Sequence, residues 1–234
     1  MTSQDDFPLD ASKYELLHLI GCGSTSEVYT AICKTNNREL AIKLINLEAY
    51  PMEIDFLRKE VAFWSSSQHP QVVKYYNSFI SKTTLYILME CMSGGSVSDI
   101  LRYSFPNGFT DEHVIATILQ AILNALNYIH SNKELHRDVK PGNALVSSDG
   151  RIKIGDFGVA ASLINNSSRY TVIGTPCYMA PEVLENTGYT EKADIWSVGI
   201  TAIELAMGSS PYSHMKPLQI VQKVLHAPPP FIPP

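Results

Sequence analysis

The segment LHRDVKPGNALV, residues 135–146, places polar and charged side chains at fixed distances between two apolar stretches. A basic residue precedes an aspartate, a lysine follows two positions later, and an asparagine follows three positions after that. If an acceptor hydroxyl attacks a phosphate of a nucleotide, one carboxylate should orient that hydroxyl or receive its proton. Asp138 is the candidate for this role, and Lys140 can reach the transferred phosphoryl group as a mobile point charge.

A second acidic segment, IKIGDFG at residues 152–158, follows after a turn at Ser-Asp-Gly. A metal ion that neutralises phosphates needs hard oxygen ligands, and carboxylate and amide oxygens suit Mg²⁺. Asp156 and Asn143 are therefore the predicted metal ligands. Each segment alone is a weak signal, because an aspartate beside basic residues is usually part of a solvated turn. Together, the two segments favour phosphoryl transfer.

Composition limits the classes of protein to which the chain can belong. The 234 residues are 45% hydrophobic and 18% charged, enough for one large domain or for two small lobes that share a core. A formal net charge of -5 argues against nucleic acids and anionic membranes as partners, because both need a cationic face. The four cysteines form no CxxC pair, which favours reduced, buried thiols over a zinc site or disulfides.

The start of the chain and its apolar runs bear on where the protein is located. The first ten residues, MTSQDDFPLD, are acidic and lack the basic and apolar regions of a signal peptide. The apolar run that comes nearest to a membrane helix, residues 193–207, is shorter than the roughly 18 to 20 residues needed and carries Asp194 and Glu204. We therefore expect a cytoplasmic protein without membrane insertion and without a nucleic acid partner.

The sequence pattern changes near residue 93. Residues 14–92 contain short apolar or alternating runs separated by Gly, Asn, Ser and Lys-Thr breaks, with one helical stripe over residues 52–66. Residues 93–234 contain helical patterns, and residues 111–130 carry an apolar face behind an acidic first turn. We expect an α+β fold with a small antiparallel β lobe and one helix in domain 14–92, and a larger, mainly α lobe in domain 93–234.

The glycine-rich segment GCGSTS, residues 21–26, reads G-x-G-x-x-S, with Ser26 at the position of a third glycine. A strand pattern follows it, whereas the Rossmann and Walker motifs both require a following helix, so those two motifs are excluded. Gly21 and Gly23 still allow the backbone to approach phosphates closely.

The motifs GCGSTSEV, AIK, HRDVKPGN, DFG, GTPCYMAPEV and DIWSVGIT follow one another in an order that resembles the eukaryotic protein kinases over residues 14–226. The segments SGGS, GTPCYMAPEV and KADIWSVGITAIELA resemble the sterile-20-like, germinal-centre group, near its oxidative-stress-responsive and plant germinal-centre-like branches. The resemblance implies a two-lobed kinase fold and a protein serine/threonine kinase (EC 2.7.11.-) that uses ATP and Mg²⁺. Lys140 fits the serine/threonine pattern, so the implied partners are protein substrates with Ser or Thr acceptors.

The resemblance also implies the residues that bind the nucleotide. Lys43 is a charge inside an apolar strand, so it needs an anionic partner; Glu60 is the expected partner and Glu53 the alternative. Lys43 itself should contact the α- and β-phosphates. Core packing would explain the apolar residues of the adenine pocket equally well. The implied adenine contacts are Ile20, Val28, Ala41 and Leu145, the backbone of Glu90 and Cys91, and Met89 as gatekeeper.

The resemblance also implies how the kinase is regulated and how much of its second lobe this sequence contains. Thr171 lies where these kinases carry their activating phosphate, which an upstream kinase would add and Arg137 would bind. Asp194 is expected to accept hydrogen bonds from the backbone of the 135–146 loop. Glu182 lacks its usual arginine partner within this sequence, so we expect a C-terminally incomplete lobe. A catalytically inactive pseudokinase or scaffold that binds nucleotide or a partner kinase is the alternative function.

Overall fold

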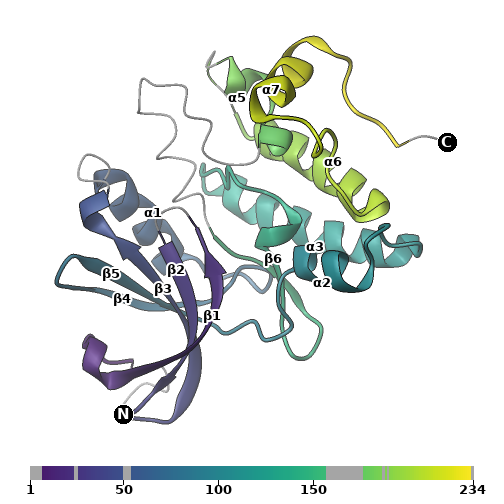
Figure 1. The fold of residues 1–234 in the computed structure, drawn as a ribbon. Helices are drawn as coiled ribbons and strands as arrows, with labels where there is room; N and C mark the ends of the chain where they lie inside the picture. Colours follow the sequence, from purple (N-terminus) through teal and green to yellow (C-terminus); the bar gives the residue numbers. More distant parts are fainter. Residues whose placement is uncertain are drawn as a thin grey trace. The chain divides into compact units, whose positions relative to one another are not determined.

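The computed structural model describes two compact units, each of which is considered by itself. The first unit comprises Met1–His69 and Val73–Ser93, and the second comprises Pro70–Val72 and Gly94–Pro234. The first is built around a sheet and the second mainly from helices, so the α+β prediction is confirmed (Figure 1). The residues described are 7–23, 26–49, 54–156, 176–185, 188 and 190–232.

The first unit contains a five-stranded antiparallel sheet whose strand order is β1-β2-β3-β5-β4. The β2–β3 and β4–β5 connections are short turns that use left-handed residues, Asn37 at φ 54° and Lys82 at φ 55°. One helix, α1, contacts β4. The elements are η1 (Ala11–Lys13), β1 (Tyr14–Cys22), β2 (Ser26–Cys33), β3 (Arg38–Asn46), η2 (Leu47–Ala49), α1 (Ile54–Ser66), β4 (Tyr75–Ser81) and β5 (Thr84–Met89).

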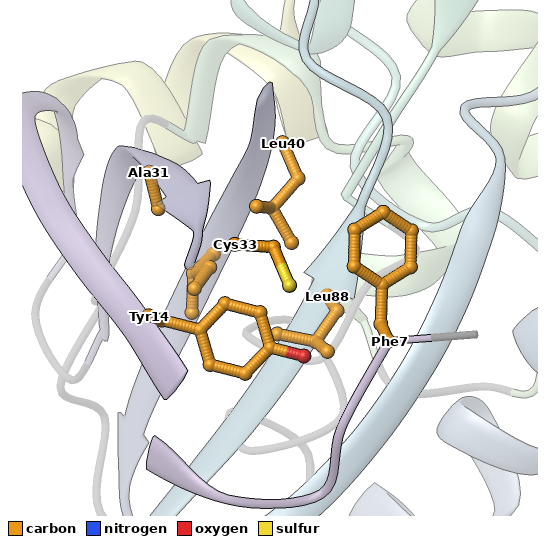
Figure 2. Packing of buried hydrophobic residues seen from close by; sticks show 7 residues of the cluster. Phe7, Tyr14, Ala31, Cys33, Leu40 and Leu88 are labelled. Carbon is orange, nitrogen blue, oxygen red and sulfur yellow. The ribbon is translucent and has the colours of Figure 1, made fainter. Parts of the chain in front are cut away.

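Side chains alternate between the two faces of this sheet, because successive residues of a strand point in opposite directions. On one face Leu40 and Ile42 of β3 and Leu88 of β5 are completely buried. Phe7, which lies before the first strand, is only 2% exposed in the same cluster (Figure 2). The remaining members of the cluster are Tyr14, Ala31 and Cys33.

The second unit is mainly helical, as predicted, and its helix ends follow local capping rules. Ser96 and Asp99 form a reciprocal capping box at the start of α2, Asp111 caps α3, and Gly208 ends α6 in a left-handed conformation. The elements are α2 (Val97–Ser104), α3 (Glu112–Ser131), η3 (Pro141–Asn143), β6 (Ala144–Val146), β7 (Ile152–Ile154), η4 (Pro176–Tyr178), α5 (Pro181–Leu184), α6 (Lys192–Met207) and α7 (Pro217–His226).

Helix α6 buries eight of its sixteen residues in the second unit, whereas Ile195 and Met207 are exposed. It contacts α3, η3 and η4, and its buried residues include both apolar and polar side chains. The buried polar side chains belong to Asp194, Ser197, Thr201 and Glu204. Because buried polar groups need hydrogen-bond partners, α6 is placed to hold the loops that surround it.

Helix α3 corrects one expectation from the sequence. No run was expected to reach the length of a membrane helix, yet α3, with 20 residues, is long and apolar enough to cross a membrane by length and composition. Core helices meet the same criterion, and α3 packs against α6 and β7 in the second unit. Its buried residues are Ile118, Ile122, Ala125, Leu126 and Ile129.

Candidate active site

The loop between α3 and β6 brings together the three residues predicted to be catalytic. The Nζ atom of Lys140 donates hydrogen bonds to both carboxylate oxygens of Asp138, at 3.0 and 2.8 Å. The amide Nδ2 of Asn143 donates to the Asp138 carboxylate at 2.8 Å and to its backbone carbonyl at 2.7 Å. The Asp138 side chain remains 30% exposed, so the carboxylate is both oriented and accessible.

Asn143 can serve two functions at once because an amide has distinct donor and acceptor ends. Both of its hydrogen bonds to Asp138 use the Nδ2 donor, which leaves the Oδ1 oxygen unused by them. This oxygen is the type of ligand that Mg²⁺ prefers. The residue is 7% exposed in the short helix η3, so the amide is held at a fixed position beside Asp138.

A buried carboxylate on α6 holds this loop. Asp194 is 1% exposed and accepts hydrogen bonds from the backbone N–H groups of His136 at 2.9 Å and Arg137 at 2.8 Å. The geometry therefore agrees with the role expected for Asp194. His130, at the end of α3, lies 2.7 Å from the same carboxylate through its Nε2 atom. Hydrogen bonds to a charged acceptor are stronger than neutral ones, so these contacts fix the backbone directly before Asp138.

His136 connects the 135–146 loop, which we call the catalytic loop because it carries the residues predicted to be catalytic, with the segment that carries Asp156. Its Nδ1 atom accepts from the backbone N–H of Asp138 at 3.3 Å, and its Nε2 atom lies 3.0 Å from the carbonyl oxygen of Gly155. Since a backbone N–H must donate, Nδ1 is the acceptor and the proton resides on Nε2. Complete burial lowers the pKa of His136, although the nearby carboxylates of Asp194, Asp138 and Asp156 oppose that shift. The imidazole is therefore neutral and structural.

Asp138 and Asp156 both lie close enough to the His136 ring to affect its pKa, so the second unit brings the two predicted acidic residues to one region. The backbone N–H of Gly155 donates to the carbonyl of Asn143 at 2.9 Å, which joins the two segments directly. Arg137 and Asp156 have left-handed backbones, with φ of 67° and 53°. Such conformations cost free energy in residues other than glycine and often occur at functional sites.

The two predicted Mg²⁺ ligands, Asn143 and Asp156, lie among the described residues. No group of three or more His, Cys, Asp or Glu side chains among the described residues could hold an ion by itself. Mg²⁺ bound to a nucleotide usually has one or two protein ligands, with phosphates and water completing its shell. The amide oxygen of Asn143 and the carboxylate of Asp156 fit this chemistry.

In the first unit, strand register places the predicted nucleotide-binding side chains on one face of the sheet. Val28 of β2 pairs with Lys43 of β3, and Ala41 of β3 pairs with Met89 of β5. Lys43 and Ala41 are two residues apart on β3, so all four side chains share a face. Lys43 is 5% exposed. This is the face opposite to that of Leu40, Ile42 and Leu88.

The glycine-rich segment lies at the end of β1, over the same part of the sheet. Gly21 pairs with Val28, and a Cβ atom at Gly21 would lie 3.4 Å from the Val28 side chain. The N–H of Gly23 donates to the carbonyl of Ser26 at 2.7 Å, so the described residues on either side of positions 24 and 25 are bonded to each other. Ile20, an expected adenine contact, is 51% exposed in the first unit.

The remaining predicted adenine contacts are divided between the two units. The N–H of Glu90 donates to the carbonyl of Lys74 at 2.9 Å, so this N–H already has an acceptor. Burial raises the pKa of the Cys91 thiol to about 11, and its Sγ atom donates to Glu39 at 3.6 Å. Leu145 is a half-buried residue of β6 in the second unit. The side chain of Glu60 and all of Thr171 lie outside the described residues.

Two supporting interactions in the second unit were not predicted from the sequence. His130 was not associated with Asp194, from which it is separated by 64 residues. Tyr178 donates through its hydroxyl to the buried Glu204, and its carbonyl accepts from Ser197 at 2.7 Å. These bonds tie residues 176–180 to α6. The apolar run around Glu204 indicates in the sequence that this carboxylate is buried and needs a donor, but it does not identify Tyr178 as that donor.

Comparison with known proteins gives a consistent result. The family described as "Protein kinase domain" matches residues 14–229. Serine/threonine-protein kinase fray2 of Dictyostelium discoideum is 45% identical over 230 residues, covering 97% of this chain and 22% of the relative. Germinal center kinase 3 of Caenorhabditis elegans is 43% identical, covering 97% of this chain and 41% of the relative. Serine/threonine-protein kinase sid1 of Schizosaccharomyces pombe is 43% identical over 96% of this chain and 47% of its own length.

The chain thus spans between about a fifth and a half of the curated relatives named here. The match covers both units and every motif from the glycine-rich segment to α6. The predicted resemblance to germinal-centre kinases is confirmed by the relatives themselves. The chain belongs to the protein kinase domain family, and its similarity is to serine/threonine kinases of the germinal-centre, sterile-20-like type.

Proposed function

We propose that this protein is a serine/threonine protein kinase that transfers the γ-phosphate of ATP to hydroxyl groups of protein substrates. The observation that carries the proposal is the Asp138 carboxylate, which is accessible and is oriented by Lys140 and Asn143. A solvated surface turn would not need a completely buried support, whereas this loop is held by Asp194. No observation favours the alternative of an inactive scaffold.

In the proposed reaction, the acceptor hydroxyl oxygen forms a bond to the γ-phosphorus while the bond between that phosphorus and the bridging oxygen of ADP breaks. The carboxylate of Asp138 orients the hydroxyl and receives its proton. Lys140 donates to Asp138 in the free protein and can donate to the phosphoryl oxygens when the nucleotide is bound. Mg²⁺, when bound, would neutralise charge on the phosphates, with Asn143 and Asp156 as its protein ligands.

The nucleotide is proposed to bind on the sheet face that carries Val28, Ala41, Lys43 and Met89. Lys43 supplies the positive charge for the α- and β-phosphates, and the three apolar side chains suit the adenine ring. Gly21, which pairs with Val28, carries no side chain, so its backbone can approach the phosphates closely.

The proposal also covers how the kinase is activated and where in the cell it acts. An upstream kinase would phosphorylate Thr171, and the added charge would be held by Arg137, whose backbone is fixed by Asp194. The proposed location is the cytoplasm, in keeping with the motif set of a signalling kinase.

The test is phosphate transfer from Mg²⁺·ATP, labelled at the γ position, to a generic acceptor protein such as casein. Asp138→Asn should lower kcat about 10²- to 10⁴-fold, because it removes the proposed proton acceptor. Asp149→Asn is the matched control, because it changes an exposed aspartate in a turn. Mg²⁺-dependent ATP binding should persist in Asp138→Asn, which separates a catalytic effect from misfolding. A variant as fast as the parent protein would overturn the proposal.

A further inference from the structure

Residues 7–13, which we call the strap, lie outside the stretch that matches the kinase family, yet they are an integral part of the first unit. The family match begins at residue 14. Phe7 is nevertheless 2% exposed, and Figure 2 shows its ring among the side chains of the strand residues Leu40, Leu88 and Tyr14. A phenylalanine at the end of a chain segment seldom becomes this buried unless the fold has a specific place for it.

The ring of Phe7 is held by aromatic and cationic neighbours. It stacks on Tyr76, with ring centroids 4.7 Å apart and planes 28° apart. The guanidinium carbon of Arg38 lies 4.8 Å from the centre of the Phe7 ring and 5.8 Å from that of Tyr76. Stacked rings and a cation near an aromatic ring are both attractive, so Arg38 of β3 and Tyr76 of β4 hold the Phe7 ring in place.

The backbone of the strap is fixed as well. The hydroxyl of Tyr14 donates to the carbonyl of Pro8 at 2.6 Å, and Asn77 donates to the carbonyl of Phe7 at 3.5 Å. Asp10 accepts from the N–H of Ser12 at 2.9 Å and caps the short helix that leads into β1. The strap is therefore held by its backbone at Phe7 and Pro8 as well as by its aromatic side chain.

The position of the strap relative to the nucleotide face follows from strand periodicity. Ile42 and Leu88 belong to the same cluster as Phe7, and they pair with each other across β3 and β5. The next residues along the two strands are Lys43 and Met89, which point to the opposite face. The strap thus covers the sheet directly behind the two strands that carry the phosphate-binding lysine and the gatekeeper.

We infer that Phe7 is a positioning residue for nucleotide binding, which acts through Ile42 and Leu88 on β3 and β5. This inference rests on the proposed function, because it assumes that ATP binds on the face of Lys43. The physical reason is that protein interiors are closely packed and transmit displacements. Loss of the ring removes the support behind β3, and the strand can then shift by an amount that matters for a bound phosphate.

The test compares Phe7→Ala with Leu9→Ala, a control in the same strap whose side chain is 60% exposed. Phe7→Ala should raise the KM for Mg²⁺·ATP about 3- to 30-fold, the range expected for a change that acts through neighbouring residues. The kcat per folded molecule and the KM for the acceptor protein should change little. Tm should fall by about 6–20 °C, as for other buried phenylalanines. Leu9→Ala should resemble the parent protein.

A purely structural role gives a different result. If Phe7 only stabilised the fold, Phe7→Ala would lower the active fraction and the apparent kcat, while the KM for ATP would stay at the parent value; this outcome would overturn the inference. Phe7→Leu should restore much of the ATP affinity, because leucine keeps apolar volume against Ile42 and Leu88.

Amide hydrogen exchange separates this inference from the proposed function. In Phe7→Ala, the N–H groups of β3 and β5 should exchange faster than in Leu9→Ala, in the absence of nucleotide. If the parent protein transferred no phosphate, the proposed function would be contradicted. Hydrogen exchange in β3 and β5 would still test whether Phe7 supports β3. Unchanged exchange in β3 and β5 would contradict the role of Phe7 even in an active kinase.

Discussion

The proposed catalytic loop of the second unit, residues 135–146, and the proposed nucleotide face of the first, which carries Val28, Ala41, Lys43 and Met89, are stabilised in different ways. The loop is held by directional hydrogen bonds, several of which end on the buried carboxylate of Asp194. The nucleotide face is held by strand pairing and by apolar packing on the other side of the sheet, where Ile42 and Leu88 are completely buried. The two regions therefore depend on different interactions.

This difference has consequences for how each part responds to substitution. Hydrogen bonds to a charged group depend strongly on distance and angle, so the loss of one acceptor should disturb the loop sharply. Apolar packing depends on buried area and volume, so the nucleotide face should tolerate apolar replacements of similar size and respond to lost volume. Four predictions test this contrast, beginning with the largest expected effect.

Asp194→Asn should be the most damaging single change in the second unit. The amide offers one acceptor in place of two and places a donor against the backbone N–H of His136 or Arg137. We expect the free energy of unfolding to fall by about 3–5 kcal/mol, measured by denaturant titration. Asp149→Asn, in an exposed turn, is the control and should have little effect. Equal denaturation midpoints for Asp194→Asn and the parent would remove the contrast between the two regions.

Lys43→Met should damage activity rather than stability. The lysine is 5% exposed, and methionine has a similar length without the charge, so the strand should keep its packing. Loss of a phosphate-binding cation should lower kcat/KM for ATP about 10²- to 10³-fold in the transfer assay. Lys34→Met, on the surface of the same unit, is the control. If Lys43→Met kept the parent's kcat/KM, the face that carries it would not be the nucleotide face.

Tyr178→Phe should have an intermediate effect on the second unit. It removes the hydroxyl that donates to Glu204, whose pKa is already raised by burial. A buried acceptor without its donor should lower the free energy of unfolding by about 1–3 kcal/mol. Tyr103→Phe, at a tyrosine that is 76% exposed, serves as the comparison. Indistinguishable melting curves for Tyr178→Phe and the parent would show that the bond to Glu204 contributes nothing.

The smallest expected effect is a pH dependence of the free energy of unfolding that comes from His136. Burial lowers its pKa below the ordinary value of 6.5, so the unfolded chain binds a proton at a pH at which the folded protein does not. The contribution is zero above about pH 6.5, becomes destabilising as the pH falls from 6.5 toward the lowered pKa, and stays constant below that pKa. His136→Gln should flatten stability against pH in that window, whereas His18→Gln, at an exposed site, should not. If the free energy of unfolding had the same slope against pH in His136→Gln and in the parent, this contribution of His136 would be contradicted.

Much of the site could be predicted because it is local in sequence. Asp138, Lys140 and Asn143 lie within six residues of one another, so a single loop must bring them close together. The shared face of Ala41 and Lys43 likewise follows from their spacing of two on one strand. Such relations are nearly independent of the rest of the fold.

The interactions that support the site could not be predicted in the same way. Asp194 was expected to hold the catalytic loop, but its contact with His130 joins residues 64 positions apart. Tyr178 and Glu204 meet across 26 positions on different elements. Phe7 lies in a stretch whose few apolar residues lack the periodicity that identifies a core position. Neither spacing nor composition encodes contacts of this kind.

The sequence by itself determined the family, the order of the elements and the polar residues that can carry phosphoryl transfer, because periodicity and short motifs depend on neighbouring residues. Only the tertiary structure decided which further groups hold these residues in place: His130 and His136 behind the proposed catalytic loop, and Phe7 behind the proposed nucleotide face. The physical reason is that each support depends on which distant segments meet when apolar surface is removed from water, and burial then makes every unpaired polar group costly.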